Sequence, residues 1–159
     1  LAAIEDARRR GMRWCLIMED DCEPYEEFVE QFPLALKVLW ENIGLWDVYY
    51  SGPSVDEYIG RLKGNILSLR PATLAQLVIV NLSAADKLLA HKEDPLAIDR
   101  YYSKYARCVT VAPMLTYQRA SKSDVQSGWD VGSTQLFTRA RGIINGFLIS
   151  HVMIIEPQI

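Results

Sequence analysis

The sequence predicts an α/β fold in which helices flank a mixed sheet. The segment Arg13–Met18 carries an unbroken apolar run, which is typical of a strand buried on both faces at the centre of a parallel or mixed sheet. Between Phe28 and Ile43, apolar residues recur at three- and four-residue steps, as on one face of a helix. Strand-like and helix-like segments mix along the rest of the chain, and strands that follow each other directly favour some antiparallel pairing.

Local signals place the elements in order. Gly11 ends the first helix, and Pro24 suits the first turn of the second, which Pro33 breaks or kinks. Ser83 caps the third helix, with Asp86 as the acid of a capping box. We expect helices over residues 1–11, 24–43, 83–92 and 96–107, and strands over 13–18, 45–50, 65–70, 74–82 and 108–115. We expect loops over residues 53–64 and 116–134, and either a helix or a strand over 146–155.

The composition indicates a single globular domain over residues 1–159. Half of the residues are hydrophobic and 23% are charged, which is ordinary for a soluble protein with its own core. The net charge of −3 is too small to indicate binding to nucleic acid or to an anionic membrane. No run approaches the ~18 apolar residues of a membrane span, so we expect none.

Two further features concern the start of the chain and its cysteines. The chain opens as a helix already under way, without an initiator methionine or a capping residue, so we expect an N-terminally incomplete fragment. Cys15, Cys22 and Cys108 are widely spaced and form no CxxC pair, which indicates free thiols and no zinc site. Free thiols are typical of a reducing compartment, so we expect a cytoplasmic protein.

Three acids, Glu19, Asp20 and Asp21, follow the first predicted strand directly. In open α/β sheets, ligands bind outside the carboxyl ends of the strands. Neighbouring carboxylates repel each other, and Mg²⁺ or Mn²⁺ removes this conflict because hard cations prefer carboxylate oxygens. Since Mg²⁺ is usually held by one or two carboxylates plus substrate phosphates, the triplet suits a metal–diphosphate site. The alternative is a solvated loop, or favourable charge at the start of the next helix.

The segment around these acids, LIMEDDCEPYEEF, resembles the acidic-motif segment of family 25 glycosyltransferases. This family includes lipopolysaccharide-type sugar transferases and collagen galactosyltransferases. Three later segments resemble the family in the same order: WDVYYSGPS, then LSAADKLLAH followed by PLAIDRYY, then VAPMLTYQRASKSDV. The resemblance covers Gly11 to Val125, and four segments in the right order make it fairly specific.

The resemblance implies a GT-A-like, Rossmann-related mixed sheet, here without the nucleotide-binding strand and helix that family members carry before the acidic segment. It also implies inverting transfer of a sugar, such as galactose or glucose, from a UDP-sugar to a hydroxyl of a glycan or protein. In the family the acidic motif binds Mn²⁺ or Mg²⁺, which maps the metal onto Asp20 and Asp21. The acceptor implies a place in glycan or lipopolysaccharide biosynthesis, in the cytoplasm or beside a membrane that carries it.

The remaining site residues are carried over in the same way. Glu19, Asp20, Gln118 and Ser123 map onto the region that binds the nucleotide sugar, with Glu19 orienting the turn. Inversion requires a base that takes the proton of the acceptor hydroxyl. Asp124 is the first choice for this base and Asp99 the second.

The same residues also have structural interpretations. Asp99 falls in the first turn of a predicted helix, where an acid is favourable without any chemistry. Asp124 could serve in a turn after Ser123, and Gln118 could bond to loop backbone.

Two other functions remain open. The first is a glycosyltransferase-like binding module without catalytic activity, because the expected front end is absent. The second is a phosphoacceptor receiver domain, in which Asp47 or Asp56 would accept the phosphoryl group. A helix before the first strand and the lack of a Lys-Pro pair after a late strand disfavour the receiver.

Overall fold

The computed structural model describes residues 1–54, 58–93, 96–119 and 132–152. The described helices are α1 (Ala2–Arg9), α2 (Phe28–Glu41), α3 (Ala85–Leu89), α4 (Ile98–Tyr105) and α5 (Gly132–Val152). The described strands are β1 (Trp14–Met18), β2 (Cys22–Pro24), β3 (Val48–Tyr50), β4 (Tyr58–Lys63), β5 (Ile66–Arg70), β6 (Leu77–Asn81), β7 (Cys108–Val111) and β8 (Thr116–Gln118). No described helix is long and apolar enough to cross a membrane.

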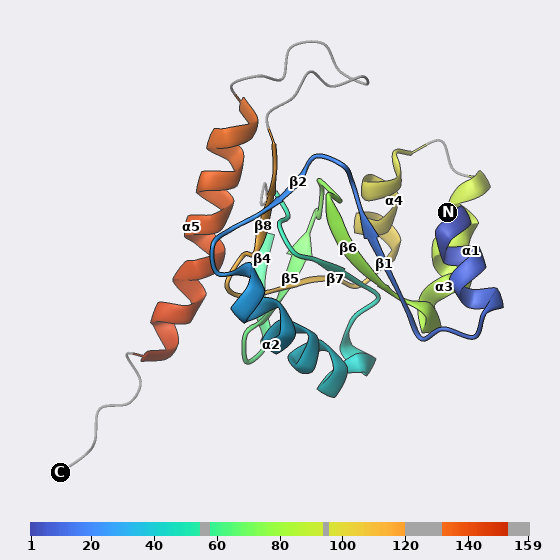
Figure 1. Cartoon of the computed structure of the whole chain (residues 1–159), viewed down its shortest axis with the longest axis horizontal. Coiled ribbons are helices and arrows are strands. Elements are labelled where there is room, and N and C mark those ends of the chain that lie inside the picture. The colour runs from blue at the N-terminus through green and yellow to red at the C-terminus, as the bar shows by residue number, and fades with distance from the viewer. Residues whose placement is uncertain (55–57, 94–95, 120–131, 153–159) are drawn as a thin grey trace.

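The strands form a mixed six-stranded sheet in the order β1-β6-β3-β7-β5-β4, and β2 pairs with β8 in a small second sheet (Figure 1). The neighbours β3 and β7 are parallel, and the other four pairs of the large sheet are antiparallel. The predicted α/β class with a mixed sheet flanked by helices is therefore confirmed.

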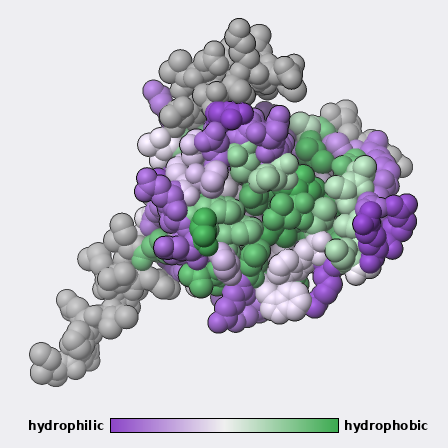
Figure 2. All heavy atoms as spheres, in the orientation of Figure 1, coloured by the Kyte–Doolittle hydropathy of each residue, from purple (hydrophilic) through white to green (hydrophobic). Residues whose placement is uncertain are grey.

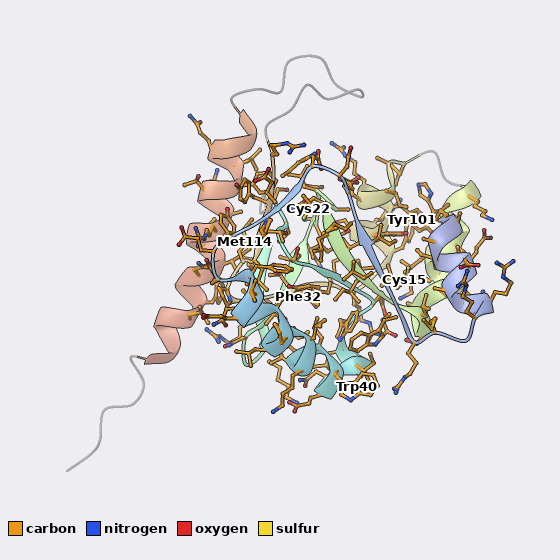
Figure 3. The ribbon with its side chains drawn as sticks, viewed as in Figure 1. Cys15, Cys22, Phe32, Trp40, Tyr101 and Met114 are labelled. Atoms are coloured by element: carbon orange, nitrogen blue, oxygen red, sulfur yellow. The ribbon has the colours of Figure 1, made fainter. Side chains whose placement is uncertain are left out.

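Helices cover both faces of this sheet. On one face, Leu88 of α3 and Tyr102 of α4 belong to the same apolar cluster as Tyr50 of β3. On the other face, Leu39 of α2 belongs to a cluster with Tyr49. Because neighbouring strand residues point to opposite faces, the burial of both tyrosines shows that β3 is covered on each side. Figure 3 shows the side chains that fill these layers.

The long helix α5 packs outside the sheet, beside β8. Phe137 and Ile144 of α5 form a third cluster with Met114, which follows β7, and with Leu67 of β5. Asn145 adds a polar contact, because its side-chain oxygen accepts a hydrogen bond from the Met114 backbone N–H at 2.9 Å. The segment 146–155 was expected to be helix or strand, and its described part, up to Val152, is helix.

The prediction that the first strand lies at the centre of the sheet is wrong. Strand β1 forms one edge, and its side chains Leu16 and Met18 are 51% and 63% exposed. The two central strands are β3 and β7, all of whose residues are buried, and β6 separates β3 from β1. An apolar run shows that a strand can be buried but does not identify its neighbours, which depend on the whole topology. Apolar residues accordingly gather in the middle of the face in Figure 2, where Figure 1 places β1.

Two predicted helix signals act differently in the structure. Pro24 ends β2 instead of opening a helix, and α2 begins at Phe28. Pro33 lies inside α2, which continues through it; the carbonyl that loses its helical partner belongs to Val29, an exposed residue. At the third helix, the Asn81 side chain accepts the hydrogen bond from the Ser83 N–H at 3.1 Å.

Consequently Ser83 is not the cap of α3, and Asp86 forms an ion pair with Arg8 of α1 instead of a capping box. The expected loop over 53–64 contains the edge strand β4, which turns back into β5 at Gly64. The polar composition of β4 suits an edge strand. Because β4 contains no apolar run, a prediction based on such runs does not detect it. The expected loop from residue 116 begins with β8.

Asp47, just before β3, is the most strongly paired buried acid of the described chain. Its carboxylate accepts hydrogen bonds from the Lys87 ammonium at 2.7 Å, from the Arg107 N–H at 2.8 Å and from the Arg107 guanidinium at 2.7 and 3.2 Å. Burial alone would raise the pKa of Asp47, but these bonds outweigh it and lower the pKa to about 2. The contact joins β3 to α3 and to the start of β7.

We expect Asp47→Asn to lower the free energy of unfolding by about 2 kcal/mol at pH 7. The pKa is lower in the folded protein than its ordinary value of 3.8, so the stabilisation is complete above about pH 5. It is lost as the pH falls through about 2. Urea titrations of both proteins at several pH values would measure this.

The matched control is Asp86→Asn, which removes the same charge from an exposed ion pair and should leave stability nearly unchanged. A stability difference between wild type and Asp47→Asn that stays constant from pH 7 to pH 2 would contradict the role given to the Asp47 charge.

Candidate functional site

The carboxyl ends of β1, β3 and β7 meet at one edge of the sheet. Strands β1 and β3 both run antiparallel to β6, and β7 is parallel to β3, so all three point the same way. Residues 19–21, 51–52 and 112–116 follow these ends. In Figure 1 the chain leaves β1 at the top of the view and continues into β2.

Backbone hydrogen bonds hold the acidic turn that follows β1. The Glu19 N–H donates to the Gln76 carbonyl at 2.8 Å, and the Cys22 N–H donates to the Glu19 carbonyl at 3.2 Å. The Arg119 N–H donates to the Asp21 carbonyl at 2.8 Å, next to the paired strands β2 and β8. The turn that carries the three acids is therefore held by Gln76, just before β6, and by Arg119, just after β8.

Asp21 and Gln118 are in direct contact. The Gln118 side-chain N–H donates to Oδ2 of Asp21 at 2.6 Å, across 97 residues of sequence. The other oxygen, Oδ1, is buried and has no hydrogen-bond partner in the described part of the chain. Gln118 is a neutral donor, so it fixes the orientation of the carboxylate without cancelling its charge. One oxygen of Asp21 thus has an acceptor capacity that no described residue uses.

Negative charge accumulates around Glu19. Its pKa is raised, first by partial burial and then by the charges of Asp21, Asp99 and Asp20. Asp99 lies in the first turn of α4, where its carboxylate accepts hydrogen bonds from the Arg100 N–H at 2.7 Å and the Leu74 N–H at 3.5 Å. The structure therefore places Asp99 close enough to act on the acidic turn electrostatically. Its bonds to the start of α4 and to Leu74 also give it a purely structural role.

The acids of this site fit a metal shared with phosphate. Among the described residues, no group of three or more His, Cys, Asp or Glu side chains is arranged to hold a metal ion, so a complete protein cage is not present there. The candidate ligands are the carboxylates of Glu19 and Asp20 and that of Asp21, whose Oδ1 has no partner among the described residues. Such a set suits Mg²⁺ or Mn²⁺ that completes its coordination with phosphate oxygens.

A buried polar cluster lies beneath the acidic turn, and the sequence reading missed it. It comprises Ser51, Gln76 and Thr116, all at most 1% exposed. The Ser51 hydroxyl bonds to the Thr116 hydroxyl, and the Gln76 amide N–H donates to the Gly52 carbonyl. The Gln76 side-chain oxygen is buried and has no partner among the described residues. Gln76 sits within the apolar segment LAQLVIV, and a lone amide in such a run is the signal that could have found it.

Position 52 requires glycine, because the chain around Thr116 leaves no space for a side chain there. A Cβ on Gly52 would lie 2.6 Å from the carbonyl carbon of Thr116 and closer still to its oxygen. Nearby, the Ser51 carbonyl accepts hydrogen bonds from the Leu115 N–H at 2.9 Å and the Thr116 N–H at 3.4 Å. The cysteine of the turn, Cys22 (labelled in Figure 3), is a free thiol, and burial raises its pKa.

A cavity of about 530 Å³ adjoins the site between β2, β8 and α5. Tyr25 and Tyr117 line it with ring centres 4.9 Å apart, and the Arg141 guanidinium lies 3.8 Å from the centre of the Tyr25 ring. Arg141 also bonds to Glu27 at 2.6 Å. Gln118 lines the same cavity, so one residue connects it to Asp21. A mixed aromatic and polar lining of this kind is typical of small-molecule sites.

Three predicted residues cannot be placed. Ser123, Asp124 and Asp56 lie outside the described residues, so their positions relative to Asp21 stay predictions. The structure does bring together Glu19, Asp20, Asp21 and Gln118, with Asp99 close enough to act on Glu19 electrostatically.

No protein-family model matches the chain, and no curated protein matches its sequence. The resemblance to family 25 glycosyltransferases therefore stays a prediction that depends on the quoted segments. The contact between Asp21 and Gln118 is independent of that resemblance, because it is a property of the structure itself.

We expect Gly52→Ala to destabilise the protein by at least about 1–3 kcal/mol, because the added methyl group overlaps the Thr116 carbonyl. Chemical denaturation would measure the change. The matched control is Gly44→Ala, where a Cβ meets no atom within 4 Å and the change should stay within about 0.5 kcal/mol. Equal effects of the two substitutions would contradict the close approach at Gly52.

Proposed function

We propose that this chain is a metal-dependent, inverting glycosyltransferase with a GT-A-like fold. It transfers a hexose from a UDP-sugar to a hydroxyl of a glycan or protein acceptor. The observation that carries this proposal is the contact between Asp21 and Gln118 at the carboxyl edge of the sheet, where the second Asp21 oxygen has no partner among the described residues. The two residues come from separate segments of the family resemblance, and their contact supports a shared function.

The acidic turn binds the donor through its diphosphate. Asp21, with Asp20 beside it, would hold Mn²⁺ or Mg²⁺, which supplies Lewis-acid stabilisation of the charge that develops on the leaving diphosphate. Gln118 keeps the Asp21 carboxylate in one orientation. Glu19 orients the turn through its backbone bond to Gln76 and adds negative charge that favours a cation.

A second carboxylate takes the proton from the acceptor hydroxyl. Asp99 acts on the acidic turn electrostatically, but two backbone N–H groups already bond to its oxygens. Those bonds occupy lone pairs that a base would direct at the acceptor hydroxyl. Asp124 therefore remains the first choice in this proposal and Asp99 the second.

The alternatives differ in what they require. A receiver domain needs an accessible phosphoacceptor, whereas Asp47 is 1% exposed and bonded to Lys87 and Arg107. A glycosyltransferase-like binding module without activity needs the same acidic turn but no base. Transfer of the sugar separates this module from the enzyme.

Calorimetry with UDP, with and without Mn²⁺, tests the metal–diphosphate site. We expect wild type to bind UDP only when Mn²⁺ is present, and Asp21→Asn to weaken that binding at least about tenfold, because a charged ligand is lost. Glu30→Gln is the matched control, since it removes one charge from the exposed start of α2 and should bind as wild type does. Equal UDP binding by wild type and Asp21→Asn would contradict the proposal.

Release of UDP from UDP-galactose or UDP-glucose tests the chemistry. We expect Asp124→Asn to keep Mn²⁺-dependent UDP binding and to lose transfer, because a base acts after the donor is bound. If Asp99→Asn shows this behaviour instead, the base is Asp99. Tight UDP binding by wild type without any sugar release would favour the inactive binding module.

A further inference from the structure

A second cavity, of about 590 Å³, lies between the end of β5, residues 71–73 and α4. It shares no lining residue with the acidic turn. Its polar lining consists of Arg70, Thr73, Arg100, Ser103 and Lys104. Three of these five side chains are cationic, and no acid is among the described residues that line the cavity, although the whole chain carries a net charge of −3. The cavity is therefore a concentration of positive charge on an acidic protein.

The two arginines of this cavity differ from most others in the described chain. Arg8, Arg107 and Arg141 each pair with a carboxylate. Within the described residues, neither the Arg70 nor the Arg100 side chain forms a salt bridge or a hydrogen bond. Among the described residues, therefore, no acceptor occupies the N–H donors of these two guanidinium groups.

The placement of Arg100 is unfavourable unless an anion is present. Arg100 is the third residue of α4, close to the positive end of the helix dipole, where a cation is destabilising. Lys104 follows four residues later, on the same face of the helix. An anion bound beside Arg100 would offset its unfavourable position at the helix start and would also lie near Lys104.

The walls of the cavity are held in place by hydrogen bonds. The Ser103 hydroxyl of α4 accepts a bond from the Ala72 N–H at 2.6 Å, which ties residues 71–73 to the helix. The Thr73 hydroxyl bonds to the Ser54 hydroxyl, and the two residues form a β-bridge. Residues 71–73, which form one side of the cavity between the cationic side chains, are therefore held in a fixed position.

We propose that this cavity is a second ligand site, which binds a phosphate group without a metal. Guanidinium groups match tetrahedral phosphate because each presents paired N–H donors in a planar fork, and an ammonium and hydroxyls complete the lining. The phosphate belongs either to a free inorganic anion or to a sugar phosphate. This site goes beyond the proposed sugar transfer and does not depend on it.

The test titrates pyrophosphate and inorganic phosphate into the protein by calorimetry, at low ionic strength and with EDTA. EDTA removes divalent metals, so the acidic turn repels these anions and does not contribute. We expect wild type to bind, and Arg70→Gln/Arg100→Gln to bind at least about tenfold more weakly, because two charge-assisted contacts are lost. Binding should also weaken as salt is added.

The matched control is Lys63→Gln/Arg139→Gln, which removes the same net charge from exposed positions outside the cavity. We expect it to bind as wild type does. Equal weakening in both double variants would show a general charge effect and overturn the proposal. Absence of binding by wild type to pyrophosphate, phosphate and glucose 1-phosphate would overturn it as well.

Glucose 1-phosphate and glucose distinguish the two sources of the phosphate group. If glucose 1-phosphate binds more tightly than inorganic phosphate while glucose does not bind, the ligand is a sugar phosphate. If inorganic phosphate binds as tightly, the free anion is sufficient. Failure of this site leaves the Mn²⁺-dependent UDP measurement unaffected, because that measurement uses other residues and a metal.

Discussion

The close approach of β3 to the chain after β7 is the constraint on which the candidate site depends. Gly52 has no space for a side chain because the Thr116 carbonyl lies against it, and the Ser51 carbonyl binds the backbone N–H groups of Leu115 and Thr116. This contact fixes where β8 begins. Since β8 pairs with β2, it also brings Gln118 to Asp21. Gly52, after β3, thus affects the position of Asp21, after β1, through β8 and Gln118.

Asp21 and Asp47 show how the same side chain serves two purposes. The charge of Asp47 is balanced by Lys87 and Arg107, and these ion pairs hold β3, α3 and β7 together. Asp21 is oriented by an amide that carries no charge, and one of its oxygens has no partner in the described chain. A carboxylate held in this way keeps its full attraction for a cation. The contrast supports a structural role for Asp47 and a binding role for Asp21.

Patterns local to one segment could be predicted from the sequence, and contacts across the sheet could not. The buried strands near 65–70, 74–82 and 108–115 were found because they are apolar, and the acidic turn was found because it follows such a run. The edge position of β1 was missed because Leu16 and Met18 look buried in sequence and are exposed in the structure. The short strands β2, β4 and β8 are polar or interrupted, and pairing with a distant partner defines them.

The same reasoning explains which site residues were found. Asp21 and Gln118 each belong to a segment that resembles a known family, whereas Gln76 becomes part of the site only through the fold. The proposed sites also differ in one physical respect. A diphosphate cannot approach the carboxylates of the acidic turn until a cation reduces their charge, whereas the cavity beside α4 already carries cations. A divalent metal would therefore direct a diphosphate to the acidic turn, and a metal-free phosphate would go to the other cavity, so that two phosphate-bearing ligands need not compete.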